Sequence, residues 1–370
     1  MEAVKTEECA TVERPVVSFC IPVYNNAQAA ETIVKELLSS DDSRFEVVVS
    51  DDVSQENVEE LLSVIHDPRF RYYRNEKNLG AHKNWEHSLE LGRGEWLYLI
   101  MARDKMHGDK ISGLIEILQH ARENGITYIK DGYVKSGTYS GIDAMIKFVI
   151  RIHPTGDIYD AELFSNIPER MKYFEMFDMF PENYIRHNLL LKGKGTFIMS
   201  GLHFWVEPKL VDFHSVISGV DKKKNVFDCY FAPRRTTIQN LENLALVDAD
   251  SSVFSCEELD RYFRANFSHA LHCVSILWQG KCADSSWMSH YSHETRRAGV
   301  REISGNIMTA YRTVKSYLQE HGTYTASRER IMRACAAKWL FYSVFRTGVR
   351  RFAEFFGLWK ILQAVKKHLQ

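Results

Sequence analysis

The stretch that decides the fold runs from Val16 to Asn26 and reads VVSFCIPVYNN. Its β-branched and apolar residues predict a buried strand over 16–21, which the turn-forming residues Pro22 and Asn25 bring to an end. Apolar residues at helical spacing follow over 27–38. This strand–turn–helix order is typical of the first unit of an α/β fold.

The same order continues through the first third of the chain. The next predicted strands lie over 45–49, 70–73 and 96–100, and the helices over 58–65, directly after Gly80, and over 111–122. The second and fourth strands are apolar throughout, which is typical of a sheet covered on both faces. Alternating strands and helices predict right-handed parallel crossovers, and hence a doubly wound, mostly parallel sheet flanked by helices. In such a sheet, ligands bind at the carboxyl ends of the strands.

Length and composition indicate a globular protein of about two domains. The 370 residues exceed what one core usually organises, and 45% hydrophobic with 26% charged residues argues against a disordered chain. Because the net charge is −1, no overall field attracts nucleic acid, and we expect no nucleic-acid partner. The seven cysteines are widely spaced and contain no CxxC pair, which disfavours a disulfide framework or a zinc site.

Targeting and membrane-spanning segments are not expected. The N-terminal MEAVKTEECATVERP lacks the basic and then apolar pattern of a signal peptide. No run of about 18 apolar residues is present that could span a bilayer. These patterns predict a cytoplasmic protein.

The last third of the sequence is predicted to be helical. Ser255 is a capping residue, and the acidic pair Glu257-Glu258 favours the first turn of the helix that follows. Helical spacing continues to 279 and then over 303–320, 328–345 and 349–369. With a boundary near Asp248, we predict a tail over 1–14, an α/β domain over 15–248 with halves 15–125 and 126–248, and a helical C-terminal region over 249–370.

Polar residues follow the predicted strand ends. They are Tyr24-Asn25 after the first strand, Asp51-Asp52 after the second, the Asn78–Asn84 segment before the third helix, and Asp104 after the fourth strand. An acidic pair at a strand end can accept hydrogen bonds from a base imide and from ribose hydroxyls. A carboxylate beyond the central strand can hold a divalent cation against a diphosphate. Each cluster alone is more often a solvated turn, but all four in order indicate a nucleotide site.

Residues from Val16 to about Leu118 resemble the GT-A domain of family 2 glycosyltransferases. The matching motifs are P.YN at Pro22, Tyr24 and Asn25; DDgS at Asp51, Asp52 and Ser54; NlG...N at Asn78, Leu79, Gly80 and Asn84; and GeY...L..DD at Gly94, Glu95, Trp96, Leu99 and Asp104. The resemblance implies a GT-A fold and a UDP-sugar donor. It also implies nucleotide-sugar-binding roles, with the uracil framed by Pro22, Tyr24 and Asp52, Asp51 nearby, Gly80 in the loop, and Lys83 close to the diphosphate.

A second segment resembles the acceptor part of the family, which reads ED...l.lR....G. It runs from Phe180 to Arg186 and ends at Lys192-Gly193-Lys194. The sequence His153-Pro154-Thr155-Gly156 also resembles a loop near the acceptor in bacterial surface-polysaccharide members. We therefore assign His153, Gly156 and Asp157 to the acceptor side, although a simple strand-ending turn explains His153-Pro154 equally well.

The metal motif departs from the family pattern. In place of Asp-x-Asp the chain has Ala102-Arg103-Asp104. Asp104 alone would then hold Mn²⁺ or Mg²⁺, and Mg²⁺ is often bound through few protein ligands. Arg103 or Lys105 could instead supply positive charge to the leaving diphosphate, unless both are solvent-facing loop residues.

The base motif departs as well. The family pattern Glu-Asp reads Glu182-Asn183 in this chain. An inverting transfer needs a base for the acceptor hydroxyl, which typically contributes ~10²–10⁴-fold to the rate. We predict that Glu182 is this base and that Asp104 is the other catalytic carboxylate, with Asp157 and Asp178 as alternatives for the base.

The segment from Val344 to Gln370 combines basic and aromatic residues. It holds six basic residues against one acid, Glu354, a net charge of +5. Its apolar residues recur near one helical face, and Gly357 is predicted to divide it into two helices. Segments of this type lie at the surface of anionic membranes. A core helix with arginines on its wet side is the alternative.

These features predict an inverting glycosyltransferase at the inner face of the plasma membrane. The expected acceptor is a lipid-linked or growing surface polysaccharide. The alternative is a catalytically weak nucleotide-sugar-binding scaffold of a polysaccharide-assembly complex, because both motif departures fall on catalytic positions. A sugar-1-phosphate nucleotidyltransferase is disfavoured because the turn over 22–26 lacks the glycine of a phosphate loop.

Overall fold

The computed structural model describes residues 14–131, 137–148, 155–168, 170, 182–192, 195–199, 203–204, 233–277 and 300–355. The chain forms two compact units. The first takes in residues 1–139, 153–169 and 188–206, and the second takes in 140–152, 170–187 and 207–370.

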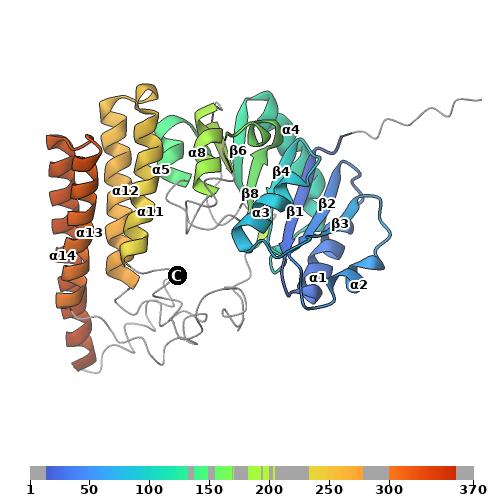
Figure 1. The fold of residues 1–370 in the computed structure, drawn as a ribbon, viewed down its shortest axis with the longest axis horizontal. Helices are drawn as coiled ribbons and strands as arrows, with labels where there is room; N and C mark the ends of the chain where they lie inside the picture. Colours follow the sequence, from blue (N-terminus) through green and yellow to red (C-terminus); the bar gives the residue numbers. More distant parts are fainter. Residues whose placement is uncertain are drawn as a thin grey trace, which may run out of the picture. The chain divides into compact units, whose positions relative to one another are not determined.

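The first unit is built on an eight-stranded sheet with the order β3-β2-β1-β4-β8-β6-β9-β7. Its strands are β1 (Val17–Val23), β2 (Phe45–Asp51), β3 (Phe70–Arg74), β4 (Trp96–Leu99), β6 (Ile126–Asp131), β7 (Gly137–Tyr139), β8 (Asp157–Asp160) and β9 (Gly195–Met199). Neighbours from β3 to β4 are parallel, as are β6 and β9, whereas β8 runs antiparallel to both β4 and β6, and β7 antiparallel to β9. The β1, β2 and β3 strands lie side by side in Figure 1.

Helices follow the first four strands as predicted. They are α1 (Ala27–Leu38), α2 (Val58–Ser63), α3 (Ala81–Glu90) and α4 (Ile111–Glu123), the last preceded by a short 3₁₀ turn, η1 (Gly108–Lys110). A further short helix, α6 (Ala161–Ser165), follows β8, and a two-stranded antiparallel ribbon joins β5 (Lys105–Met106) to β10 (His203–Phe204). The doubly wound, mostly parallel sheet flanked by helices is therefore confirmed. The antiparallel insertion of β8 was not predicted.

The core of this unit lies on both faces of β1, β2 and β4. Every residue of β1 and β2 is buried, which is the physical reason why most of their residues are apolar. The rings of Phe45 and Tyr98 pack against Phe19 with centroids 5.6 and 5.3 Å away. Gly94, just before β4, has no room for a side chain, because a Cβ there would lie 2.6 Å from the backbone nitrogen of Ser18.

The second unit is helical. It contains α5 (Gly141–Phe148), α11 (Pro233–Ala249), the 3₁₀ turn η2 (Ser251–Val253), α12 (Cys256–Leu277), α13 (Val300–Glu320) and α14 (Ala326–Phe355). The predicted helical C-terminal region is thus confirmed within the described ranges. The long helices α12, α13 and α14 pack on one another (Figure 1). The helix α8 (Glu182–Lys192) begins in this unit and ends in the first.

Side-chain contacts at the helix ends fix this bundle. The Ser255 hydroxyl accepts a hydrogen bond from the Glu258 N–H at 3.3 Å, and the Glu258 carboxylate accepts from the Ser255 N–H at 2.9 Å. The predicted Ser255 cap is confirmed, and the reciprocal bond to Glu258 makes it a capping box. Arg328, near the start of α14, donates to both oxygens of Asp248 at 2.9 and 2.6 Å and lies over the ring of Phe263. The start of α14 is thereby held to the end of α11 and to α12.

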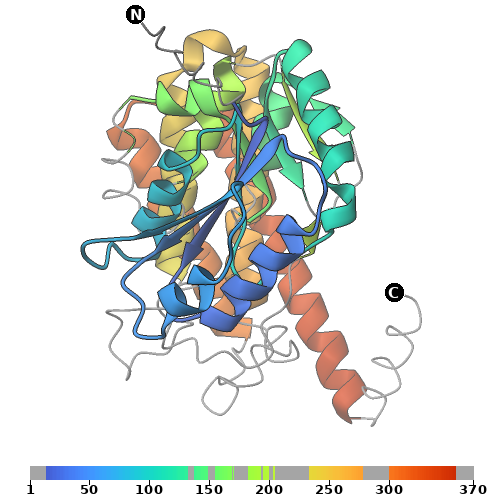
Figure 2. The same ribbon diagram turned by 90° about the vertical axis from the view of Figure 1, so that its right-hand side faces the viewer.

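The helix α14 is longer than predicted. It runs without a break from Ala326 to Phe355, so the prediction of one helix ending at Phe345 and another beginning at Val349 is wrong (Figure 2). The intervening residues Arg346 to Gly348 contain no proline, and one glycine costs a helix only about 1 kcal/mol. Gly357 lies outside the described residues. Within the described ranges, no helix combines the length and apolar character that a bilayer crossing needs.

We expect acid to destabilise the helical unit through His269 on α12. Burial lowers the pKa of His269 to about 4, and the charge of His272 adds to this effect. Between the usual pKa of 6.5 and about 4, His269 is mostly protonated in the unfolded chain and mostly neutral in the folded chain. The free energy of unfolding should therefore fall as the pH drops from 6.5 toward 4, by about 2 kcal/mol at pH 5 from this group.

Urea unfolding at pH 7.5, 6 and 5 measures this effect. His269→Gln should flatten the dependence, whereas His120→Gln, on an exposed face of α4, should leave it unchanged. An equally steep dependence in His269→Gln would show that another group is responsible.

Candidate functional site

The candidate site lies in the first unit, where β1 pairs in parallel with β2 on one side and with β4 on the other. The strand order 3-2-1-4 reverses between β1 and β4, and ligands in open α/β sheets bind at the carboxyl ends on either side of such a reversal. Pro22 is buried near the end of β1, Tyr24 is half-buried after it, and Asp104 is buried after β4.

Asp51 ends β2 and is completely buried. Its Oδ1 accepts from the Ser54 N–H at 2.9 Å and from the Ser54 hydroxyl at 2.5 Å. Its Oδ2 accepts from the Tyr72 hydroxyl at 2.8 Å and from Arg74 at 2.6 Å. Burial and the charge of Asp51 both raise the pKa of Tyr72, so that Tyr72 stays a donor. With two partners on each oxygen, Asp51 fixes the turn after β2 and ties β2 to β3.

Asp52 fixes the loop that leads into α3. Its Oδ1 accepts from the Leu79 N–H at 2.7 Å and from the Asn75 amide at 3.0 Å, and its Oδ2 accepts from the Gly80 N–H at 2.9 Å. Its backbone carbonyl accepts from the Asn78 amide at 2.9 Å. The separate DDgS and NlG motifs are thus one hydrogen-bonded structure. Oδ2 has one partner among the described residues, whereas a carboxylate oxygen can accept about two hydrogen bonds.

Gly80 is needed for its backbone conformation. Its φ is 83° and its ψ is 161°, a combination that is almost exclusive to glycine. No atom lies within 4 Å of the place where a Cβ would stand, so space is not the constraint. The loop can therefore place two consecutive N–H groups on Asp52 only because residue 80 is glycine.

Gly80→Ala is expected to lower the free energy of unfolding by about 1–3 kcal/mol, the usual cost of such a backbone conformation. Gly113→Ala is the matched control, because Gly113 lies in the helix α4, also has open space around it and has no positive φ. That control should be neutral or stabilising by up to about 1 kcal/mol. Urea unfolding of both variants decides the matter. Equal stability of Gly80→Ala and the wild type would contradict the conformational argument.

Asn84 is a site residue that the sequence analysis quoted only as part of a motif. It is buried on α3, and its Oδ1 accepts from the Ser50 hydroxyl at 2.7 Å and the Asn75 amide at 3.0 Å. Its own amide donates to the Ser50 carbonyl at 3.1 Å and to the Val23 carbonyl at 3.5 Å. Asn84 therefore joins α3 to the ends of β1 and β2. Lys83, its neighbour, is half-buried in the first turn of α3.

Arg103 is not a solvent-facing loop residue. It is half-buried, and its Nε donates to the Asn26 side chain at 2.9 Å, at the start of α1. Burial lowers the pKa of Arg103 from its usual value, and the charge of Glu56 opposes this. A guanidinium thus stands between the loops after β1 and β4. Lys105, in contrast, is exposed.

Asp104 is held where β4 ends. Its Oδ2 accepts from the Met101 N–H at 2.9 Å and from the hydroxyl of Thr155. Asp104 is buried, with 5% of its surface exposed. Among the described residues, no three His, Cys, Asp or Glu side chains lie together as a metal-binding group. Asp104 fits a cation only as a single oxygen ligand, so that a donor diphosphate would have to supply other ligands.

Gly156 and Asp157 join β8 to the strands beside it. The Gly156 N–H donates to the Leu99 carbonyl at 2.9 Å, and its carbonyl accepts from the Asp131 N–H at 2.8 Å. Asp157 has no exposed surface, and its carboxylate accepts from the Lys130 ammonium at 2.7 Å. The hydroxyls of Tyr128 and Tyr159 donate to the same carboxylate, each at 2.8 Å. His153 and Asp178 lie outside the described residues.

Glu182 begins α8 in the second unit and is 2% exposed. Its neighbour Asn183 accepts from the Arg186 guanidinium at 2.9 Å and donates to the Asn243 side chain at 3.2 Å. The asparagine that replaces the family's aspartate therefore has a structural role, as it links α8 to α11. Glu182 is the buried carboxylate that remains at this motif.

Residues 18–181 match the model of the family described as Glycosyl transferase family 2. The resemblance predicted from the strand-end motifs is thereby confirmed for this part of the chain. All four strand-end motifs fall in the matched region.

Relatives and one solved structure show partial similarity. An uncharacterized protein of Mycobacterium tuberculosis is 32% identical over 25% of this chain and 29% of its own length. A protein of Escherichia coli named putative colanic acid biosynthesis glycosyl transferase is 27% identical over 34% of this chain and 46% of its own. The structure of S. aureus TarS 1-349 with UDP-GlcNAc has a TM-score of 0.46 and 14% identity, over 83% of this chain and 92% of that one. The chain thus spans less than half the length of these two curated relatives.

Proposed function

We propose, from the family 2 glycosyltransferase domain that residues 18–181 form, that this protein transfers a sugar from a UDP-sugar to a polysaccharide acceptor. One observation carries the proposal: Asp52 joins the DDgS and NlG motifs into a single hydrogen-bonded structure at the ends of β1, β2 and β4. A site built in this way presents backbone and carboxylate groups to a nucleotide at the place where the fold binds ligands.

The nucleotide would lie against the loops after β1 and β2. Pro22 and Tyr24 would frame the uracil, and the Oδ2 of Asp52 retains a lone pair for its imide N–H. Asp51 would act indirectly, because its oxygens already hold the turn. Gly80 and Lys83, at the amino end of α3, would face the phosphates, which the positive end of a helix dipole favours.

Positive charge at the diphosphate would come from two sources. Arg103 is a cation fixed near the end of β4. Mn²⁺ or Mg²⁺ would use the Asp104 carboxylate and supply further charge neutralisation when it is bound. Negative charge develops on the diphosphate as its bond to the sugar breaks, so that fixed positive charge there lowers the barrier.

The transfer would invert the anomeric carbon. Glu182 would take the proton of the acceptor hydroxyl, whose oxygen forms the new bond to that carbon while UDP leaves with the electron pair of the old one. Gly156 and Asp157 would shape the acceptor side by holding β8 in place, and His153 is assigned to that side from its sequence motif. The acceptor would be a lipid-linked or growing surface polysaccharide, which the name of the Escherichia coli relative supports.

The protein would work at the cytoplasmic face of the plasma membrane. The basic and aromatic segment from Val344 onward would contact anionic lipid there. In its described part, Phe345 and Val349 are 61% and 45% exposed, which supports a surface helix rather than a core helix.

A second candidate function is a nucleotide-sugar-binding scaffold. Ala102 stands where the family has an acid, and the amide of Asn183 is engaged with Arg186 and Asn243. UDP release with a panel of UDP-sugars and glycan acceptors separates the two. Turnover supports the transferase, whereas nucleotide binding without turnover for every pair supports the scaffold.

Thermal shift with UDP and Mn²⁺ tests the donor site. We expect UDP to raise the Tm, Mn²⁺ alone to have no effect, and the two together to raise it further, because ligand at about 100 times Kd stabilises by about 2.7 kcal/mol. Asp104→Asn should lose the Mn²⁺-dependent part and keep the UDP part. Asp109→Asn, an exposed control, should behave as the wild type. A full Mn²⁺ response in Asp104→Asn would place the metal elsewhere.

A further inference from the structure

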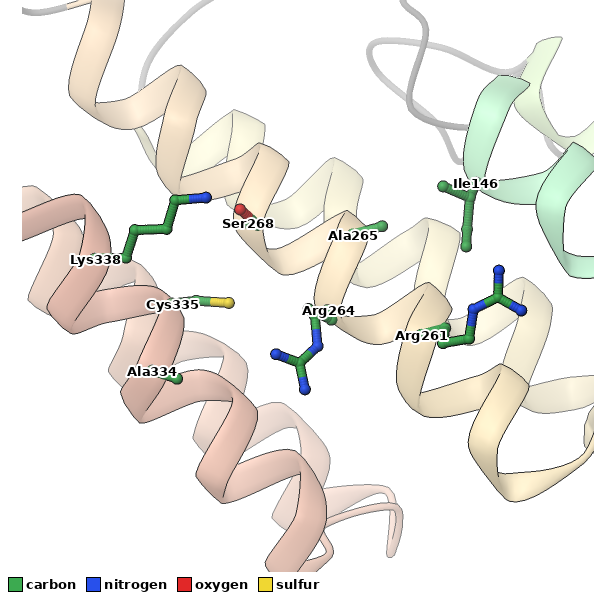
Figure 3. Close-up of a pocket in the computed structure, with 8 residues that line it drawn as sticks. All are labelled: Ile146, Arg261, Arg264, Ala265, Ser268, Ala334, Cys335 and Lys338. Atoms are coloured by element: carbon green, nitrogen blue, oxygen red, sulfur yellow. The ribbon is translucent and has the colours of Figure 1, made fainter. Parts of the chain in front are cut away.

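A basic hollow lies in the second unit, and none of the residues that line it is assigned to sugar transfer. It has a volume of about 440 Å³ and lies among α5, α12 and α14 (Figure 3). Its lining includes Ile146 of α5, Arg261, Arg264 and Ser268 of α12, and Cys335 and Lys338 of α14.

Two of the three basic side chains that line this hollow have no acidic partner among the described residues. Arg261 pairs with Asp143, but Arg264 and Lys338 form no ion pair with any described residue. In Figure 3 the guanidinium of Arg264 points toward α14, and the ammonium of Lys338 points toward α12. Both charges act on Cys335, where they oppose the rise in pKa that burial causes. Two cations therefore face one small space.

The hollow also offers a neutral hydrogen-bond donor. The Ser268 hydroxyl accepts from the Trp339 indole N–H at 3.1 Å, so that its own proton can be donated to another acceptor. A hydroxyl beside two or three cations is a donor set for phosphate oxygens. None of the described residues that line the hollow is acidic and would oppose an anion.

An exposed apolar stripe continues from the hollow along α14. Phe341, Tyr342, Phe345 and Val349 are 72%, 44%, 61% and 45% exposed. At 3.6 residues per turn, these positions follow Ala334 and Lys338 on the same face of the helix. The rings of Phe341 and Phe345 lie 6.1 Å apart. Large apolar side chains on the surface of a helix mark an interaction site.

We propose that the hollow binds the phosphodiester headgroup of an anionic phospholipid, while Phe341, Phe345 and Val349 enter the acyl boundary of the membrane. Along one face of α14, Lys338 at the hollow is followed by exposed apolar side chains, which matches the order of headgroup and acyl chain in a phospholipid. Free phosphate would satisfy the cations but leave the apolar stripe in water. This inference deepens the proposed membrane location and rests on it, but it does not depend on sugar transfer.

Cosedimentation of the full chain with vesicles tests the proposal. We expect binding to vesicles of phosphatidylcholine with phosphatidylglycerol, and weak binding to phosphatidylcholine alone. The variant Arg264→Gln with Lys338→Gln should bind the anionic vesicles about tenfold or more weakly, because each basic residue near such a surface contributes about 1 kcal/mol. The control, Arg301→Gln with Arg312→Gln, removes the same charge from exposed positions of α13 and should bind as the wild type.

Three results would overturn the proposal. The first is equal binding of anionic vesicles by the Arg264→Gln, Lys338→Gln variant and the wild type. The second is equal binding of the wild type to both kinds of vesicle. The third is binding of inorganic phosphate, measured by calorimetry, by a protein that does not bind either kind of vesicle. Phe345→Ser provides a second variant, expected to weaken vesicle binding while phosphate binding is unchanged. UDP release measured without vesicles reports sugar transfer separately, so that failure of one proposal is distinguishable from failure of the other.

Discussion

The rate of sugar transfer by Glu182→Gln is expected to be about 10²–10⁴-fold lower than that of the wild type. This is the usual contribution of a positioned base, and the amide cannot accept the proton of the acceptor hydroxyl. Glu182 is the buried carboxylate of its motif, because position 183 is an asparagine engaged with Arg186. UDP release under saturating donor and acceptor measures the change. The expected loss is in kcat, while donor binding by calorimetry stays unchanged.

Two further variants test the assignment of Glu182 as the base. Glu257→Gln removes an exposed carboxylate from the first turn of α12 and should turn over as the wild type. Asn183→Asp restores the family's second acid beside Arg186, and it should not rescue Glu182→Gln if Glu182 is the base. Undiminished turnover in Glu182→Gln would move the role to another group.

Lys130→Met is expected to lower the free energy of unfolding by about 3–5 kcal/mol, the usual cost of breaking a buried ion pair from one side. The Lys130 ammonium lies 2.7 Å from Asp157, and the two side chains are 11% and 0% exposed. Lys130 also donates to the Thr155 carbonyl at 2.7 Å. Without the lysine, the carboxylate of Asp157 would stay buried between β6 and β8 and would lose the ammonium that balances its charge.

Urea unfolding of three proteins checks this result. Lys77→Met replaces an exposed lysine and should change stability by no more than about 0.5 kcal/mol. Adding Asp157→Asn to Lys130→Met removes the carboxylate charge that has lost its ammonium partner. The double variant should recover about 1–3 kcal/mol of the lost free energy of unfolding. If Lys130→Met were as stable as Lys77→Met, the ion pair would not be what holds β8 in the sheet.

The two catalytic motifs that differ from the family pattern have different contacts in the structure. Arg103, which occupies the x of the metal motif, is half-buried and bonded to Asn26, so that it is a fixed cation. Asn183 links α8 to α11. The altered metal motif would affect how the charge of the leaving diphosphate is neutralised. The altered base motif would affect which residue takes the proton of the acceptor hydroxyl.

The sequence by itself determined the first four sheet strands and the four α-helices of the first 123 residues. Mostly apolar, β-branched runs set β1 and β2, and the turn residues that follow each run set where the strand ends. Ser255 and Glu258 likewise marked the start of α12. These features depend on burial and on hydrogen bonds across a few residues, which local patterns encode. The family match, over residues 18–181, includes most of this stretch.

Only the tertiary structure decided what each polar residue does. Asp51 and Asp52 are adjacent in sequence, yet one holds a turn and the other holds a loop that begins 26 residues later. The contact between Asp104 and Thr155 and the pair of Lys130 with Asp157 also join distant segments. The break that patterning predicted between Phe345 and Val349 is absent from α14, because a single glycine does not stop a helix. Local sequence specifies which residues are buried, but the partners of a buried polar group depend on the strands and helices that packing brings beside it.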